Sequence, residues 1–297
     1  MKIVKAVIPV AGLGTRLLPA TKAIPKEMLP IVDKPLIQYV VEECIQAGIE
    51  EIILVTHASK NSIENHFDTS FELETKLEQK VKRQLLESVQ EIIPSEITIM
   101  HVRQGSAKGL GHAVSCARPI IGDSPFALIL PDVIIDEHTC NLMTDNMSEM
   151  FENYKRTNIS QIMVEEVPVE EVHKYGIVDL DGKKLSPGKY CNIKAMIEKP
   201  DKEMAPSNYA MVGRYILSPD IWDILDNTAA DDSGEIQLTS ALSTLLSSNE
   251  INAFCIQGKS HDCGSKLGLL KTNVIYGLNH KEISSSLKDF LQTIKLK

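Results

Sequence analysis

The segment from residue 7 to residue 30 gathers glycines and cations behind an apolar run. It reads VIPVAGLGTRLLPATKAIPKEMLP, with its cations at Arg16, Lys22 and Lys26. Prolines at positions 19, 25 and 30 restrict the backbone around these cations and would stiffen the loop that carries them. A glycine pair alone is explained equally well by the geometry of a turn, but cations on a stiff loop beside it favour a site for phosphate.

This segment matches neither of the two best-known phosphate loops. A dinucleotide fingerprint needs a third glycine where the chain has Leu17, and a P-loop needs lysine where Thr15 follows Gly14. The sequence therefore predicts phosphate binding by another kind of loop, and Leu17 argues against a dehydrogenase.

Two aspartates follow strand-like runs and could bind a metal ion. Asp132 ends the run FALILPD, and Asp262 follows NAFCIQG within KSHDCG. Carboxylates at the carboxyl ends of strands face the ligand crevice of an α/β sheet, where Mg²⁺ prefers hard oxygen ligands. Each aspartate alone is also explained as a helix cap or a turn residue.

Two further groups combine polar side chains with turns. In the run MIEKP, Glu198 could bind sugar hydroxyls and Lys199 a phosphate, or the two could form a surface pair before a turn. In RQGSAKGLGHA, Gln104 carries both a donor and an acceptor, which suits the edge of a base, and Gly109 would allow a close approach. His112 lies in the same turn and is not assigned as a base, because a histidine at the start of a helix is more often structural.

Composition narrows the class of protein. The 297 residues carry a formal net charge of −9, which argues against a nucleic-acid partner. Six scattered cysteines without metal-binding spacing favour free thiols in a reducing cytoplasm. No apolar stretch approaches the ~18 residues that span a bilayer, so we expect a cytoplasmic protein and no membrane.

The first half of the chain alternates between strand-like and helix-like segments. A helix with Ile37, Val40, Val41, Cys44 and Ile45 on one face is predicted before Gly48. This alternation predicts a doubly wound, mostly parallel sheet flanked by helices. The expected strands are residues 3–10, 51–57, 97–102, 126–132 and 161–167.

The remaining segments alternate less regularly. Residues 71–93 carry Leu77, Val81, Leu85 and Val89 at steps of four and are predicted as one long, exposed amphipathic helix. We also expect an antiparallel pair at 174–182 and 192–200, helices at 234–246 and 284–296, and a returning strand at 252–258. One continuous domain over 1–280 and a C-terminal helix over 281–297 follow from this pattern.

Taken together, the motifs resemble the bacterial UTP–glucose-1-phosphate uridylyltransferases. The resemblance covers nearly the whole chain, in order, and is carried by AGLGTRLLPATKAIPKEMLP, RQGSAKGLGHAV, LPDVIIDE, YGIVD, IEKP, PSNYAMVGRYIL, EIQLT and HDCGSKLG. It implies a Rossmann-like nucleotide-diphospho-sugar transferase fold, with a nucleotide-binding half at about 1–135 and a sugar-binding half at about 136–280. It also implies the reaction of UTP with glucose 1-phosphate to give UDP-glucose and pyrophosphate, assisted by Mg²⁺.

The resemblance implies a role for each matching residue. Catalysis would rest on Arg16, Lys26, Asp132 and Lys199, and the metal would be held by Asp132 and Asp262. The nucleotide would contact Ala11, Gly12, Gly14, Arg16, Lys26, Gln104 and Gly109. The sugar phosphate would contact Gly176, Glu198, Lys199 and Val212.

Other members of the fold class stay open as alternatives. The same fold could serve a thymidylyl- or adenylyltransferase, and a regulatory paralogue could bind sugar nucleotides without turnover. One departure from the family is Ser240, where EIQLT is often followed by aspartate. The resemblance further implies a homodimer or homotetramer, with the helices at 71–93 and 284–296 as possible contacts.

Overall fold

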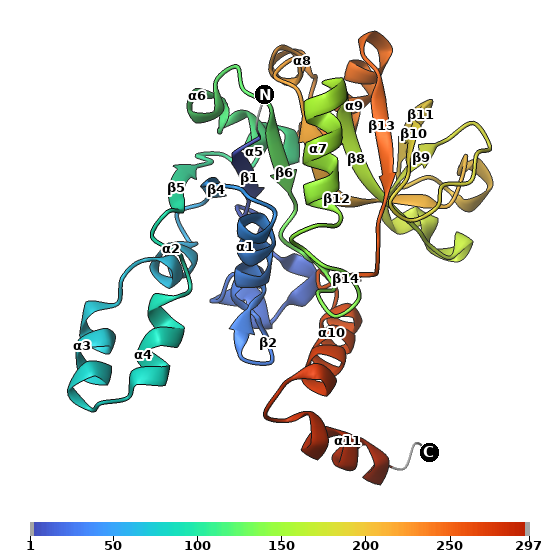
Figure 1. Ribbon diagram of the computed structural model, residues 1–297. Coiled ribbons are helices and arrows are strands. Elements are labelled where there is room, and N and C mark those ends of the chain that lie inside the picture. The colour runs from blue at the N-terminus through green and yellow to red at the C-terminus, as the bar shows by residue number, and fades with distance from the viewer. Residues whose placement is uncertain (1–2, 295–297) are drawn as a thin grey trace.

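The apolar runs predicted as buried strands form the centre of one ten-stranded sheet (Figure 1). The structure is a computed structural model that describes residues 3–294. The strands of the sheet are β1 Lys5–Pro9, β4 Glu51–Thr56, β5 Thr98–Arg103, β6 Phe126–Ile129, β8 Ser160–Glu166, β9 Gly176–Asp179, β10 Tyr190–Asn192, β11 Ala195–Glu198, β12 Tyr209–Leu217 and β13 Ile251–Cys255.

Most strands of this sheet run in the same direction. The spatial order is β10-β13-β8-β12-β6-β1-β4-β5, and β6, β1, β4 and β5 are parallel to one another, as β8 and β13 are. The long strand β12 runs antiparallel to both β6 and β8 and joins the two parallel groups. Off this path, β9 and β11 form the predicted antiparallel excursion. The predicted α/β fold, with a Rossmann-like and mostly parallel sheet, is confirmed.

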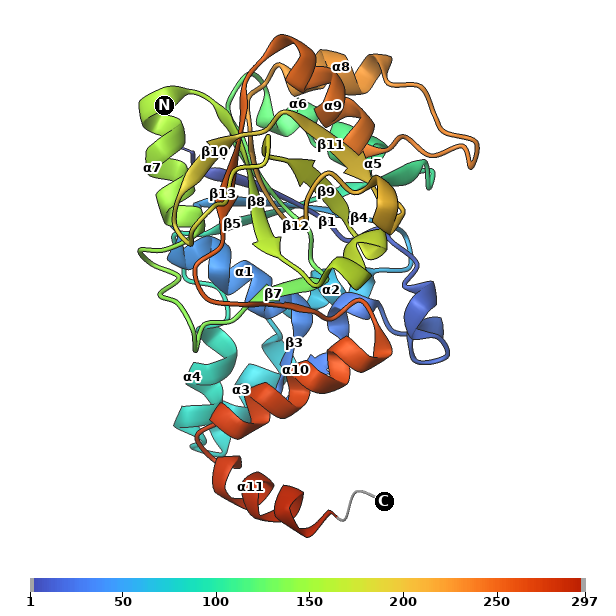
Figure 2. The ribbon, with the colours of Figure 1, turned by 90° about the vertical axis from the view of Figure 1, so that its right-hand side faces the viewer.

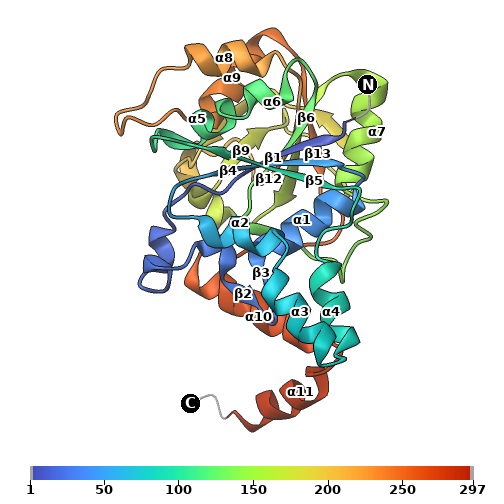
Figure 3. The same cartoon turned by 90° about the vertical axis from the view of Figure 1, so that its left-hand side faces the viewer.

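Both faces of the sheet are buried, because successive residues of each strand point to opposite sides. Val7 and Ile53 pack against α5, α8 and α9, whereas Ile8 and Ile52 pack against α1 and α7. Figures 2 and 3 show helices above and below the sheet. Burial on both faces explains why β1 and β4 are continuous apolar runs.

The helices are interspersed among the strands. The predicted helix before Gly48 is confirmed as α1, and Ile37, Val40, Val41 and Cys44 are buried in it. The helices are α1 Leu36–Gln46, α2 Asn61–Phe67, α3 Phe71–Gln79, α4 Arg83–Gln90, α5 Gly109–Ser115, α6 Arg118–Ile121, α7 Met147–Thr157, α8 Ile221–Asn227, α9 Leu238–Ser248, α10 Lys266–Asn279 and α11 Ser284–Thr293. Within residues 3–294, no helix is both long and apolar enough to cross a membrane.

The prediction of one long helix over 71–93 was wrong. The segment forms the two helices α3 and α4, which pack side by side and project from the body (Figure 1). The chain reverses at Val81, whose φ of 54° lies in the left-handed region that ends a helix. No residue of either helix is buried, so the four-residue apolar spacing does not mark a core-facing stripe.

Two short ladders lie at the carboxyl edge of the sheet. The strand β7 Val133–Ile135 pairs with β14 Ser260–Asp262, and β2 Pro30–Ile31 pairs with β3 Lys34–Pro35. The first ladder brings together two segments that are far apart in the chain, each carrying one of the predicted metal-binding aspartates.

Candidate active site

The glycine loop after β1 folds back on itself and carries Lys26 close to the glycines. Gly14 has a φ of +67°, and a Cβ at this position would lie 3.1 Å from Cβ of Lys26. The hydroxyl of Thr21 donates a hydrogen bond of 2.8 Å to the carbonyl oxygen of Gly14. Both the backbone angle and the lack of space therefore favour glycine at position 14.

The two cations of this loop meet Asp132 beyond the end of β6. Nζ of Lys26 lies 3.0 Å from Oδ2 of Asp132, and one terminal nitrogen of Arg16 lies 3.4 Å from the same oxygen. The Lys26 side chain is 16% exposed and that of Arg16 is 63% exposed. Burial alone would raise the pKa of Asp132, but the charges of Lys26 and Arg16 hold it below its ordinary value. Asp132 is thus an anion at neutral pH.

Asp262 lies beside Asp132 because β14 pairs with β7. The backbone N–H of Cys263 donates to the carbonyl oxygen of Asp132 at 2.8 Å, and the N–H of Gly264 donates to Oδ1 of Asp262 at 2.8 Å. A Cβ on Gly264 would lie 3.0 Å from a carboxylate oxygen of each aspartate and 2.6 Å from Arg16. The two carboxylates and the guanidinium therefore surround one point, which a side chain at position 264 would fill.

This arrangement fits a divalent metal ion that takes part of its coordination from a substrate. Within residues 3–294, no cluster of three or more His, Cys, Asp or Glu side chains could hold a metal by itself. Mg²⁺ is bound in many enzymes by one or two carboxylates together with waters and phosphate oxygens. The pair Asp132 and Asp262 supplies that donor set.

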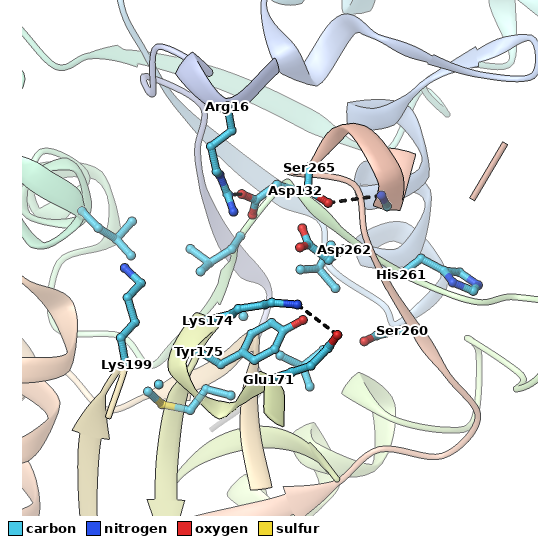
Figure 4. A pocket seen from close by; sticks show the side chains of 18 of the residues that line it. Arg16, Asp132, Glu171, Lys174, Tyr175, Lys199, Ser260, His261, Asp262 and Ser265 are labelled. Atoms are coloured by element: carbon cyan, nitrogen blue, oxygen red, sulfur yellow. Dashed lines mark hydrogen bonds and ion pairs between the residues drawn. The ribbon is translucent and has the colours of Figure 1, made fainter. Parts of the chain in front are cut away.

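A pocket of about 820 Å³ joins these carboxylates to the second half of the chain. In Figure 4, Asp132 and Asp262 lie near its centre, Arg16 reaches in from the glycine loop, and Lys199 stands apart beyond β11. The predicted site residues that line the pocket are Arg16, Asp132, Gly176, Glu198, Lys199, Val212 and Asp262. Lys26 joins this group through its contact with Asp132.

Gly176 and Glu198, two of the residues predicted to contact the sugar phosphate, lie on the paired strands β9 and β11, and α9 packs beside β11. Gly176 stands opposite Glu198 in the ladder. Glu198 accepts a hydrogen bond of 2.8 Å from the Thr239 hydroxyl, and its other oxygen lies 3.2 Å from Nζ of Lys199. Lys199 has a φ of 44°, an uncommon conformation for a residue with a side chain, and such strain is frequent at functional sites. Glu198 and Lys199 thus face the same pocket although they are adjacent in sequence.

Gln104 and Gly109 lie together at the end of β5, outside the lining of this pocket. The amide nitrogen of Gln104 donates to the carbonyl oxygen of Gly109 at 3.2 Å and to Nδ1 of His112 at 2.9 Å. A carbonyl oxygen only accepts, so the amide nitrogen faces it and Nδ1 of His112 acts as an acceptor. Burial, followed by the charge of Lys108, lowers the pKa of His112, consistent with a neutral ring.

The remaining glycine-loop residues lie under or beside Lys26. A Cβ on Gly12 would lie 4.0 Å from Cε of Lys26, and Ala11 is buried two positions after the end of β1. Lys22, the third cation of the loop, is exposed and does not line the pocket. The structure therefore separates Lys22 from the other two cations, a distinction that their spacing in sequence does not make.

Sequence reasoning missed several residues that line the pocket. Lys174, Tyr175 and Thr239 do so, as does Lys271 on α10. Lys174 is paired with Glu171 at 2.9 Å. The signal for Lys174 and Tyr175 was available, since both directly precede Gly176 at the start of β9. Lys271 gave no signal, because only the packing of α10 beside β14 brings it to the pocket.

Comparison with known families identifies the class. The sequence profile described as "Nucleotidyl transferase" matches residues 5–277. The chain therefore belongs to the nucleotidyl transferase family.

Individual relatives narrow the assignment. The chain is 59% identical to the UTP–glucose-1-phosphate uridylyltransferase of Escherichia coli (strain K12) over 98% of this chain and 96% of the relative. Among solved structures, it resembles a UTP-bound UGPase from Acinetobacter baumannii with a TM-score of 0.92 and 46% identity, covering 99% of this chain and 100% of that one. A UDP-glucose pyrophosphorylase complexed with UDP-glucose matches with a TM-score of 0.83 and 44% identity over 94% of this chain and 100% of that chain. Within the nucleotidyl transferase family, this chain groups with the UTP–glucose-1-phosphate uridylyltransferases.

Proposed function

We propose that the protein transfers the uridylyl group of UTP to α-D-glucose 1-phosphate and releases pyrophosphate. The relatives that support this proposal cover nearly the full chain and are named for that reaction. The structural observation that carries it is the single point shared by Asp132, Asp262 and Arg16 in a pocket that extends to Glu198 and Lys199.

The proposed reaction needs positioning and positive charge rather than a base. An oxygen of the sugar phosphate attacks the α-phosphorus of UTP, a new P–O bond forms, and the bond from that phosphorus to the leaving pyrophosphate breaks. The attacking oxygen is already ionised near neutral pH, so no proton has to leave. The barrier comes from bringing two polyanions together and from charge on the leaving group.

Arg16 and Lys26 are suited to the triphosphate. Both already bind the carboxylate of Asp132, so they can turn to phosphate oxygens without leaving the site. Lys26 is the less exposed of the two, and a partly buried cation interacts more strongly with an anion than a solvated one does. We assign the stabilisation of the departing pyrophosphate to this pair.

We further propose that Asp132 and Asp262 hold Mg²⁺. Nucleotidyl transferases typically use a divalent metal ion. Bound between these carboxylates, Mg²⁺ would neutralise charge on the phosphates and hold them at the right distance. Asp132 is suited to this role by geometry, because one oxygen of its carboxylate and one of Asp262 each lie 3.0 Å from the same point, the position of a Cβ on Gly264.

The remaining assignments concern recognition. Gly176, Glu198 and Val212 would contact the glucose, and Lys199 its phosphate, while Gln104 and Gly109 would contact uracil above the loop of Ala11, Gly12 and Gly14. The chain has six free cysteines, which agrees with the predicted cytoplasmic location. That location, the homodimer or homotetramer and the absence of a nucleic-acid partner stay predictions.

Pyrophosphate release from UTP and glucose 1-phosphate, with and without Mg²⁺, tests the proposal. We expect turnover that requires the metal and that prefers UTP over dTTP, ATP and CTP. Preference for dTTP or ATP would assign the fold to another nucleotide. Binding of UDP-glucose without any turnover would instead favour the regulatory alternative. A Lys199→Ala variant should raise KM for glucose 1-phosphate, and a wild-type kcat/KM in this variant would refute its assignment.

A further inference from the structure

A buried arginine lies directly beneath the segment that carries Asp132. Arg214 on β12 has no exposed surface, and Glu43 on α1 is almost fully buried beside it. Nε of Arg214 donates to Oε1 of Glu43 at 3.0 Å, and a terminal nitrogen donates to Oε2 at 2.7 Å. This pairing is bidentate, which fixes the plane of the guanidinium group.

The same guanidinium also binds the backbone on both sides of Asp132. One terminal nitrogen donates to the carbonyl oxygen of Leu130 at 3.0 Å, and the other donates to that of Val133 at 2.8 Å. Only Pro131 and Asp132 lie between these two carbonyls. The turn that presents the carboxylate is thus held at both ends by one rigid side chain.

A bulge in β12 aims Arg214 at this turn. The register of β12 against β8 shifts between Met211 and Tyr215, and Gly213 has a φ of +80°. The N–H of Leu130 donates to the carbonyl oxygen of Gly213 at 2.8 Å. Met211 and Gly213 also line the pocket on its sugar side. The bulge is therefore in contact with both the sugar side and the carboxylate turn.

Net stability alone does not explain this arrangement. Replacing a buried ion pair by apolar side chains of similar volume is often neutral or stabilising, because both charges must lose their water. An arginine with five hydrogen bonds, two of them to backbone flanking a functional carboxylate, is better explained by the geometry that it imposes.

We propose that Arg214, fixed by Glu43, is a positioning residue that sets the placement of Asp132 for metal binding. The inference rests on the proposed role of Asp132 in the function above. It assigns to Arg214 no contact with substrate or metal. Supporting residues around metal ligands typically change metal affinity 10–100-fold when they are altered.

Metal binding to the whole protein tests this proposal separately from activity. The probe is Mn²⁺, whose free concentration is measured by electron paramagnetic resonance without nucleotide. The main variant, Arg214→Met/Glu43→Leu, removes both charges together, so no charge is left buried alone. The control is Arg118→Met on α6, before the amino end of β6 and outside the pocket. This variant breaks ion pairs with Asp223 and Asp226 on α8.

We expect the double variant to keep a urea midpoint close to that of the wild type and to bind Mn²⁺ about 10-fold more weakly or worse. The Mg²⁺ concentration for half-maximal pyrophosphate release should rise in parallel, with KM for UTP at saturating Mg²⁺ changing less. Arg118→Met should leave the Mn²⁺ affinity unchanged. A folded double variant with wild-type Mn²⁺ affinity would overturn the proposal, since a merely structural role predicts that result.

Two further variants keep every outcome decisive. Should the double variant fail to fold, Arg214→Lys decides, because it keeps a positive charge beside Glu43 but cannot donate to Glu43 and to both backbone carbonyls in one plane. A several-fold loss of Mn²⁺ affinity supports the proposal, and no change refutes it. An Asp132→Asn variant with wild-type Mn²⁺ affinity would also refute the proposal, because Asp132 would then not be a ligand of the metal. The wild-type protein could release no pyrophosphate while the variants show the expected losses of Mn²⁺ affinity. That result would reject the proposed function and leave the inference about Arg214 intact.

Discussion

The ion pair beneath Lys26 allows a quantitative prediction about stability. Glu27 and Lys60 are 0% and 4% exposed, and Nζ of Lys60 lies 2.8 Å from Oε2 of Glu27. Oε1 of Glu27 is also buried and has no hydrogen-bond partner within the described residues. Lys60→Met would remove the main partner of a carboxylate that has no access to water.

We expect Lys60→Met to cost about 3 kcal/mol at pH 8. Breaking a buried pair by removing one partner costs roughly 3–5 kcal/mol, and the neighbouring charge of Lys26 places this case at the lower end. For a chain of this size, that loss corresponds to a decrease of roughly 5–10 °C in Tm. The double variant Glu27→Gln/Lys60→Met should recover part of the loss, because no uncompensated charge is left.

The loss should also depend on pH. Burial raises the pKa of Glu27 although Lys60 and Lys26 lower it, so the folded protein favours the protonated acid more than the unfolded chain does. A carboxyl group whose pKa is raised by folding contributes its full stabilisation below its ordinary pKa of 4.5. This contribution is lost as the pH rises through the pKa of the group in the folded protein. Without Lys60 the folded pKa rises further. The destabilisation should therefore be smaller at pH 5 than at pH 8.

Thermal and urea unfolding followed by circular dichroism at both pH values provide the test. The matched control is Lys194→Met, which removes an exposed pair of similar length, 2.7 Å between Nζ and Oδ1 of Asp181, and should leave Tm almost unchanged. The reasoning would be refuted if Lys60→Met melted within about 2 °C of the wild type at pH 8, or if its loss were equal at both pH values.

Three further outcomes follow from the site and from the helical hairpin. Lys26→Met should lower kcat about 100-fold or more in the pyrophosphate assay with Tm little changed, because a preorganised charge is lost; a kcat near wild type would exclude Lys26 from catalysis. His112→Phe should lower the ratio of kcat/KM for UTP to kcat/KM for CTP, because the amide of Gln104 loses the acceptor that orients it. His112→Asn should preserve the ratio, and equal ratios in the two variants would contradict this reasoning. Val81→Gly should stabilise the protein by about 1 kcal/mol in urea unfolding, because a β-branched residue at positive φ is strained, and a destabilised variant would show that the turn at Val81 is not strained.

Local patterns were sufficient to predict the parallel strands of the sheet and the positions of the two carboxylates. β1, β4 and β6 are buried on both faces, which produces continuous apolar runs that read as strands without further information. Asp132 and Asp262 were predictable because the carboxyl ends of such strands meet at one edge. The ladder of β7 with β14 then brings these two residues together across 130 positions of the chain.

The features that were missed depend on contacts between distant segments. β12 lies at the centre of the sheet and runs antiparallel to both β6 and β8. Predicting this position and direction requires knowledge of both neighbouring strands. Arg214 and Glu43 are 171 positions apart, and neither residue type predicts a buried pair. The break at Val81 has no glycine or proline to announce it, so the spacing of apolar residues alone predicted an unbroken helix.

The two buried ion pairs occupy related positions in the fold. Glu27–Lys60 anchors the turn that carries Lys26, and Glu43–Arg214 anchors the turn that carries Asp132. Lys26 and Asp132 bind each other in the structure, whereas the proposed reaction requires Lys26 to turn to phosphate and Asp132 to a metal ion. Such an exchange of partners needs turns that hold both side chains in place. Anchoring by buried charge meets this requirement better than apolar packing, because a bidentate or ion-paired contact fixes direction as well as distance.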